Sequence, residues 1–271
     1  MTPNRGLTWL ARGGYAARGV VYLIIGGFAL LAAIGSGQPV DSHQSLQTVL
    51  AQPSGSTLLW IVVIGLAAFA AWRAVQALRD SDHHGTDLKG LTIRTGLLAS
   101  GVTYVLLALF ALGLLISGFK TSGEGGGSGG GGQAQDFLSH LLSWDHSNIV
   151  IRLIALIPLG VGIAHIIKGW KASFERYFEA DEGVMRMVRP VSRFGLIARG
   201  VAFIEIAVLL AVSGSRYDAM HPPGIKEALN GLQNLPFGHI ILLVVALGLI
   251  AFAVYSFAEA VWRRINMNVP V

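Results

Sequence analysis

The chain has 271 residues, of which 53% are hydrophobic and 13% are charged, about half the charged fraction of an ordinary soluble protein. It contains no cysteine, which excludes disulfide bridges, thiolate catalysis and cysteine-bound metal ions. The formal net charge is +5, but the basic residues gather in alternate loops. That distribution indicates membrane topology rather than nucleic-acid binding.

Six apolar stretches follow one another along the chain, and each has about the 20 residues that a helix needs to cross a bilayer. They cover residues 15–34, 58–78, 97–117, 149–168, 195–213 and 239–261. They leave too little chain for a separate soluble domain. We therefore expect an all-α integral membrane protein with six transmembrane helices in a single membrane domain, residues 1–271.

Most Lys and Arg residues flank the N-terminus, the 79–96 loop, the 168–199 loop and the C-terminus. The positive-inside rule assigns such loops to the cytoplasm. The sequence therefore predicts a multi-pass protein of the bacterial inner (plasma) membrane with both termini cytoplasmic.

The apolar stretches form three copies of a two-helix repeat. The sequence RGGYAARGVVY at residues 12–22 returns as RTGLLASGVTY at 94–104 and as RFGLIARGVAF at 193–203. Repeat one spans 7–80, repeat two 89–178 with a Gly-rich outer-loop insertion at 123–132, and repeat three 188–265. Repeats inserted in the same orientation are related by an axis along the membrane normal. We expect pseudo-threefold symmetry about that normal.

The motif Arg-x-Gly-x-x-Ala-Arg/Ser-Gly-Val-x-Tyr/Phe, repeated three times among six spans, resembles a bacterial family of unknown function, DUF1206. The resemblance covers essentially the whole chain. It implies a six-span inner-membrane protein, and it implies no activity, substrate or cofactor.

Small residues recur about one helical turn apart in each copy of the motif. Such residues let membrane helices approach closely, so we interpret them as packing positions, with a ligand cradle as the alternative. These positions are Gly14, Ala17, Gly19, Gly96, Ala99, Gly101, Gly195, Ala198 and Gly200. The motif also begins with an arginine at the inner boundary in each copy, Arg12, Arg94 and Arg193, which we expect to anchor the helices to lipid headgroups.

Two further arginines, Arg18 and Arg199, lie about two turns inside their helices. A charge at that depth normally has a polar partner. The second helices of the same repeats carry Gln76 and Glu259 at one equivalent position, and repeat two has neither the arginine nor the partner. We predict that Arg18 faces Gln76 and that Arg199 faces Glu259, each pair closing its own hairpin.

Glu205 and His165 are the remaining polar candidates within the spans. Glu205 lies where the other repeats have Ile24 and Leu106, so the fold does not require it, and intramembrane carboxylates often mark ion or proton paths. His165 is equivalent to Trp72 and Tyr255, which favours packing over a relay. We leave both residues open between structural and functional roles.

The sequence favours an uncharacterised, non-catalytic interaction or membrane-organising protein, because it contains no catalytic, cofactor-binding or metal-binding motif. The alternative is a small-solute or ion channel or transporter, possibly proton-coupled, that uses Glu205 and His165. An enzyme acting on lipid ranks third. The expected partners are the lipid bilayer and a protein partner or second copy of the chain, with no nucleic acid.

Overall fold

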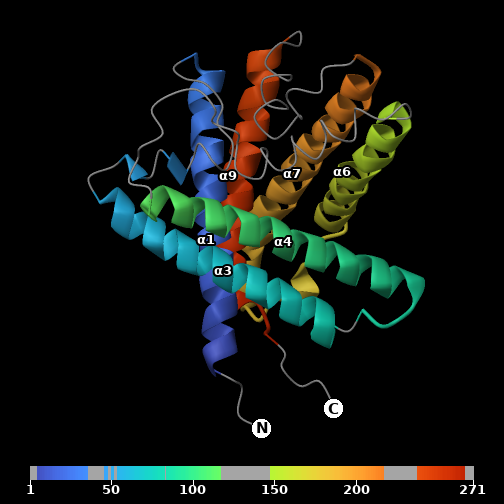
Figure 1. The fold of residues 1–271 in the computed structure, drawn as a ribbon. Helices are drawn as coiled ribbons and strands as arrows, with labels where there is room; N and C mark the ends of the chain where they lie inside the picture. The colour runs from blue at the N-terminus through green and yellow to red at the C-terminus, as the bar shows by residue number, and fades with distance from the viewer. Residues whose placement is uncertain are drawn as a thin grey trace.

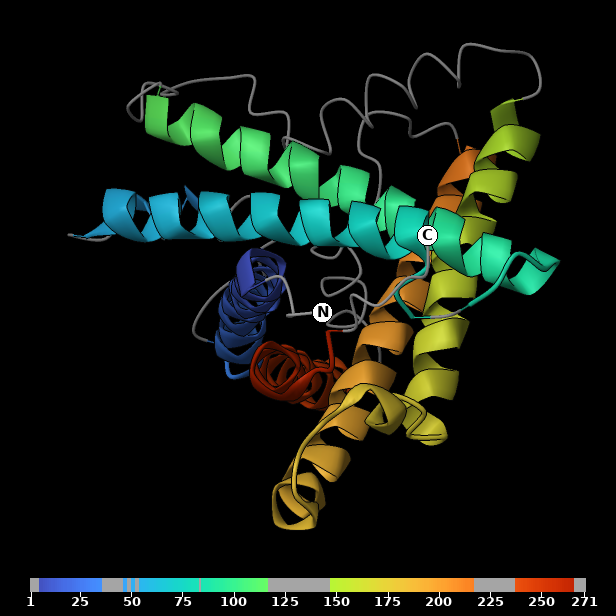
Figure 2. The ribbon, with the colours of Figure 1, turned by 90° about the horizontal axis from the view of Figure 1, so that it is seen from below.

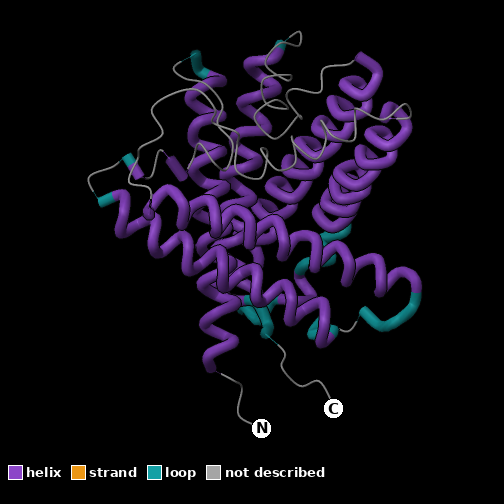
Figure 3. Tube along the Cα trace, viewed as in Figure 1, coloured by secondary structure: helices purple, strands orange, loops and turns teal. Residues whose placement is uncertain are grey.

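The computed structural model describes residues 5–35, 46–47, 50–51, 54–82, 84–116, 147–216 and 237–265. Within these ranges the regular structure is helical, apart from one isolated β-bridge, as Figure 3 shows. The Gly-rich insertion predicted at 123–132 lies outside the described residues.

Six α-helices coincide with the six apolar stretches. They are α1 (Arg5–Ala33), α3 (Gly55–Arg79), α4 (Leu88–Ile116), α6 (Ser147–Trp170), α7 (Glu182–Arg216) and α9 (Gly238–Trp262), with a 3-10 turn η1 (Glu175–Tyr177) between α6 and α7. Over their described residues, α1, α3, α4 and α9 are long and apolar enough to cross a membrane, and α6 has a shorter apolar stretch, Ala155–Trp170. The chain therefore has the character of a membrane protein.

The helices associate as three antiparallel pairs, α1 with α9, α3 with α4, and α6 with α7. Each pair joins the second helix of one repeat to the first helix of the next repeat, and the α1–α9 pair returns from repeat three to repeat one. The pairs point in different directions: α3 and α4 cross in front of the upright α1 and α9 (Figure 1), which are seen end-on after a quarter turn (Figure 2).

The third small residue of each motif, Gly19, Gly101 or Gly200, lies at the contact within a pair. A β-carbon at Gly19 would meet the Phe257 ring of α9. In the same way Gly101 lies against α3 and Gly200 against α6. Close approach at these three positions is the geometry that small residues give to membrane helices.

The hairpins of repeats one and three are closed by the other small residues of the motif. Gly65 of α3 lies against Ala17 of α1, and Gly248 of α9 lies against Ala198 of α7, so closely that a β-carbon on either glycine would overlap the alanine. Gly14 and Gly195 lie against the backbones of Phe69 and Phe252 in the same two hairpins.

Repeat two lacks this closure. Its second helix has Pro158 at the position of Gly65 and Gly248, and the proline ring and missing N–H disturb both the helix and its contact surface. Helices α4 and α6 are not among the pairs that pack together. Gly96 has no side-chain or backbone neighbour at the place of a β-carbon, and Ala99 is exposed.

Candidate functional site

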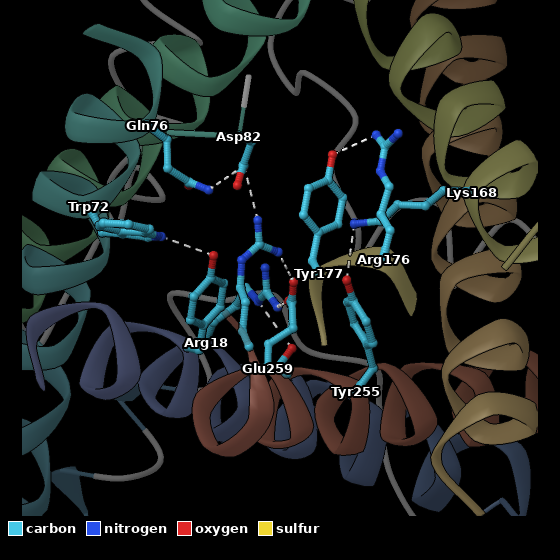
Figure 4. A network of polar contacts seen from close by, with 12 residues as sticks. Arg18, Trp72, Gln76, Asp82, Lys168, Arg176, Tyr177, Tyr255 and Glu259 are labelled. Carbon is cyan, nitrogen blue, oxygen red and sulfur yellow. Dashed lines mark hydrogen bonds and ion pairs between the residues drawn. The ribbon is translucent and has the colours of Figure 1, made fainter. Parts of the chain in front are cut away.

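A buried ion network joins the first and last helices (Figure 4). The Arg18 guanidinium donates through Nη2 to the carboxylate of Glu259 and through Nε to Ser256 Oγ at 3.0 Å. Both charged side chains are almost fully buried, at 3% and 2% exposure. An ion pair at this depth is strongly coupled, because removing one member leaves the other charge desolvated and uncompensated.

The network continues through Arg263 to the loop after α3. Arg263 Nη1 donates to Glu259 Oε1 at 2.5 Å, and Nη2 donates to Asp82 Oδ2 at 3.0 Å. Gln76 Nε2 also donates to Asp82, at 2.8 Å, and Gln76 Oε1 accepts from Arg73 Nη1 at 3.0 Å. Two arginines thus share two carboxylates across α1, α3 and the C-terminal end of α9.

Arg263 is held in place by a short backbone pairing. It forms the isolated antiparallel bridge with Phe178, just after η1. The N–H of Arg264 donates to the carbonyl of Tyr177 at 2.8 Å, and the N–H of Glu179 donates to the carbonyl of Trp262 at 2.7 Å. The chain after α9 is therefore fixed to the segment that follows η1.

Aromatic rings surround the buried cations. The guanidinium carbon of Arg18 lies 5.1 Å from the centroids of both Phe69 and Phe252 and 5.2 Å from that of Tyr15. Phe252 also faces Arg199, at 4.4 Å. Cation–π contacts of this kind offset part of the desolvation of the guanidinium groups.

The predicted pairing within hairpins is wrong. Arg18 of repeat one faces Glu259 of repeat three, while Gln76 contacts Arg73 and Asp82. The physical reason is the cyclic pairing of the helices, which sets the first helix of each repeat against the second helix of the preceding repeat.

Arg199, in the first helix of repeat three, likewise faces the second helix of the preceding repeat. Its Nη1 lies 3.3 Å from His165 Nε2, while His165 Nδ1 lies 2.8 Å from the carbonyl of Val161. A carbonyl only accepts, so Nδ1 carries the proton and Nε2 accepts from Arg199. The imidazole is thereby the neutral partner of a buried guanidinium.

A chamber of about 1040 Å³ opens beside this network. All six α-helices and the loops that follow α3 and α6 contribute to its wall. In every helix the lining residues lie in the half nearest to these loops. The chamber is therefore on one side of the molecule.

The chamber wall carries an excess of positive charge. Its cationic side chains are Arg18, Arg73, Lys168, Arg176, Arg199 and Arg263, and its carboxylates are Asp82, Asp87 and Glu259. Arg18 and Arg263 are neutralised by two of the carboxylates. The other four cations form no ion pair with a described residue; Lys168 Nζ donates instead to the hydroxyl of Tyr255 at 3.0 Å.

His84 lies on the chamber wall in the loop after α3. Its backbone N–H donates to Asp80 Oδ1 at 2.7 Å. Burial lowers the pKa of the His84 imidazole below its ordinary value, against the opposing effect of the Asp82 and Asp80 carboxylates. The nearby Arg176 and Arg263 lower this pKa further. The lowered pKa of His84 therefore reflects mainly its burial.

The arginines that begin two of the motifs contact protein carbonyls. Arg94 Nε donates to the carbonyl of Ala77 at 2.6 Å, and Arg193 donates to the carbonyls of Gly169 and Trp170 at 3.2 and 3.0 Å. Each therefore caps the C-terminal end of the preceding repeat's second helix. Arg12 has a buried Nε without a hydrogen-bond partner among the described residues. Contact with lipid headgroups stays a prediction for all three.

Glu205 does not belong to the chamber. It is half-buried on α7, is absent from the chamber wall, and makes no hydrogen bond or ion pair with a described residue. The structure therefore brings Arg18, Arg199, Glu259 and His165 to the chamber and leaves Glu205 outside it.

Sequence reasoning missed Arg263, Asp82, Arg73 and Lys168. Arg263 could have been found from its spacing, because it follows Glu259 by four residues and so lies on the same helix face. Arg73 and Lys168 carry no such signal, since their equivalents in the other repeats are uncharged.

Residues 13–80, 95–172 and 194–263 match the family described as Domain of Unknown Function (DUF1206). The uncharacterized protein YxxB of Bacillus subtilis (strain 168) is 29% identical over 256 residues, which cover 93% of this chain and 90% of the relative. No solved structure matches the chain.

Proposed function

Since the chain belongs to the DUF1206 family, whose description assigns no activity, we propose its function from the chamber: it is a non-catalytic membrane protein that binds an anionic ligand. The observation that carries the proposal is the surplus of cations on the chamber wall. Arg73, Lys168 and Arg199 have no carboxylate partner among the described residues. A desolvated cation normally has an anionic partner, and here a ligand supplies it.

The proposal includes a topology. The six helices span the bacterial inner membrane as a ring of three pairs related by a pseudo-threefold axis along the membrane normal, with both termini and the chamber mouth facing the cytoplasm. The basic residues near the loops after α3 and α6 support this orientation. Because the chain has no cysteine, single cysteines test it: an impermeant maleimide applied to spheroplasts labels Ser54→Cys and leaves Thr86→Cys unlabelled. The reverse pattern contradicts the orientation.

A binding role fits the chamber better than a reaction or a conduit. The most deeply placed cation, Arg18, is neutralised by Glu259 and enclosed by aromatic rings, so it serves as part of the wall. The wall residues come from one side of the molecule. A ligand held there could organise the surrounding bilayer or recruit a protein partner or second copy of the chain.

Thermal unfolding of the purified, delipidated protein tests the binding role. Anions offered as phosphate esters, inorganic phosphate or anionic lipids raise the melting temperature of the native chain, because a ligand that binds only the folded state stabilises it by mass action. Arg73→Gln combined with Arg199→Gln abolishes the increase. The proposal fails if no class of anion stabilises the native chain more than this variant.

The contact between His165 and Arg199 favours a second candidate, transport of a small anion coupled to a proton. A neutral imidazole beside a guanidinium in a chamber wall can take up a proton when an anion enters. Flux of a labelled anion into proteoliposomes, driven by a pH gradient and abolished in His165→Gln, would support this candidate. Glu205→Gln is the control, because Glu205 lies on the neighbouring helix α7 but not on the chamber wall.

A further inference from the structure

We infer that the ligand of the chamber is the headgroup of an anionic phospholipid, which enters sideways from the bilayer between α4 and α6. The inference rests on the proposed binding function and names the ligand class. Three observations carry it: guanidinium groups on the chamber wall without a carboxylate partner, a group of apolar residues on one side of the chamber, and a hairpin whose described residues lack the close helix contact of the other two.

The first observation concerns the inner end of the chamber. Arg73 and Arg199 line the chamber with half-buried side chains and have no carboxylate partner among the described residues. Two guanidinium groups on one wall without a counter-charge suit an acceptor-rich, anionic ligand. Phosphate oxygens match planar guanidinium donors.

The second observation concerns the side of the chamber. The apolar lining residues there are Leu88, Ile93 and Leu97 from α4 and Ala164 and Ile167 from α6, and the polar lining residues of the same helices are Thr92, His165 and Lys168. The apolar side chains offer no hydrogen bond to a soluble anion. They match an acyl chain, so the chamber combines a cationic end with a hydrocarbon side, as a phospholipid does.

The third observation explains why a lipid can reach the cations. In the other two hairpins the glycine–alanine contacts seal the space between the helices, whereas in repeat two Pro158 replaces the glycine and Ala99 is exposed. Helix α4 packs on α3, and α6 packs on α7, while the described residues of α4 and α6 form no extensive contact with each other. Basic pockets between membrane helices on the cytoplasmic side are suited to anionic lipid headgroups.

Native mass spectrometry of the full delipidated chain tests the inference by titration with cardiolipin, phosphatidylglycerol, phosphatidylethanolamine or inorganic phosphate. We expect the two anionic lipids to bind and zwitterionic phosphatidylethanolamine to bind at least about tenfold more weakly, as loss of a charge-assisted contact would give. Arg73→Gln with Arg199→Gln should weaken anionic lipid binding by a similar factor. Arg186→Gln, an exposed arginine on α7 outside the chamber, should not.

A second variant keeps every charge and blocks the side entrance. Ala164→Phe narrows the wall between α4 and α6, so it should weaken lipid binding while leaving the fold, measured by circular dichroism, unchanged. The inference is overturned if Ala164→Phe binds anionic lipid like the native chain, or if phosphatidylethanolamine binds equally. Displacement of lipid by millimolar inorganic phosphate also overturns it and would leave the proposed function standing with a soluble anion as ligand.

Discussion

The hairpins of repeats one and three differ from the hairpin of repeat two in one contact. In the first two, a glycine in the second helix admits an alanine of the first helix, Ala17 or Ala198, and the helices close on each other. In repeat two the glycine is Pro158 and the helices stay apart. The pairing between repeats is nevertheless kept in all three. The glycine–alanine contact therefore distinguishes the closed hairpins from the open one, while the contacts between repeats are common to all three.

The packing of α1 against α9 depends on the buried ion network as well as on small residues. Glu259→Gln removes the carboxylate shared by Arg18 and Arg263 and leaves desolvated guanidinium groups, so we expect a loss of about 3–5 kcal/mol in unfolding free energy. Thermal unfolding in detergent measures it. As a control, Arg189→Gln breaks an exposed pair with Glu175 and should change nothing measurable. Equal effects of the two variants would show that the network does not secure the ring.

Equivalent glycines give a matched test of the open and closed hairpins. A β-carbon at Gly195 would overlap the backbone of Phe252, whereas one at Gly96 meets no neighbour. We expect Gly195→Ala to destabilise the protein by about 1–3 kcal/mol through overpacking. Gly96→Ala should be neutral or stabilising by up to about 1 kcal/mol through helix propensity. A similar loss in both variants would place α4 and α6 in contact and remove the opening.

Cysteine reactivity distinguishes the same hairpins without altering their packing strongly. Ala99 is exposed, while its equivalents Ala17 and Ala198 are each 7% exposed. In a chain without native cysteine, Ala99→Cys should react with N-ethylmaleimide in detergent several-fold faster than Ala17→Cys or Ala198→Cys. Denatured samples, in which all three thiols react alike, provide the control. Equal protection in the folded state would contradict the open hairpin.

The smallest expected effect is a pH dependence carried by His84 at the chamber mouth. Its pKa is lowered in the folded protein, mainly by burial, so the folded state binds this proton less readily than the unfolded state. The stability that this group contributes is full above the unfolded pKa of about 6.5 and is lost as the pH falls through the folded value. Melting temperatures between pH 8 and pH 5 should therefore decline less steeply in His84→Gln. The comparison keeps the other charged groups that act on His84, which are Asp80, Asp82, Arg176 and Arg263.

The helices could be predicted from the sequence because each apolar stretch is a local property of the chain. The partners of the buried charges could not, because a threefold repeat is equally compatible with contacts inside a hairpin and contacts to the next one. Arg18 and Gln76 occupy the predicted positions along their helices, yet Arg18 meets Glu259 from the far end of the chain.

The chamber itself was not predictable from any residue pattern, because it arises where a contact is missing. Pro158 lies within the second apolar stretch of repeat two, but its consequence depends on the position of α4, which the sequence does not determine. Arg73, Asp82 and Lys168 become wall residues only because the three helix pairs meet around the chamber. Such convergence is a property of tertiary structure and leaves no periodic signal.

Because α1 and α9 are neighbours, the three repeats could be connected in a different order along the polypeptide without changing their packing. The start of α1 and the end of α9 lie on the same side of the molecule, since the two helices are antiparallel neighbours (Figure 1). A circularly permuted gene that fuses these ends and opens the chain within the Gly-rich stretch 123–132 would preserve every interhelical contact described above. In it, the sequence separation of Arg18 and Glu259 would fall from 241 residues to about 30 (12 after Glu259 plus 18 to Arg18), and the same arrangement of helices would be encoded from a different starting point.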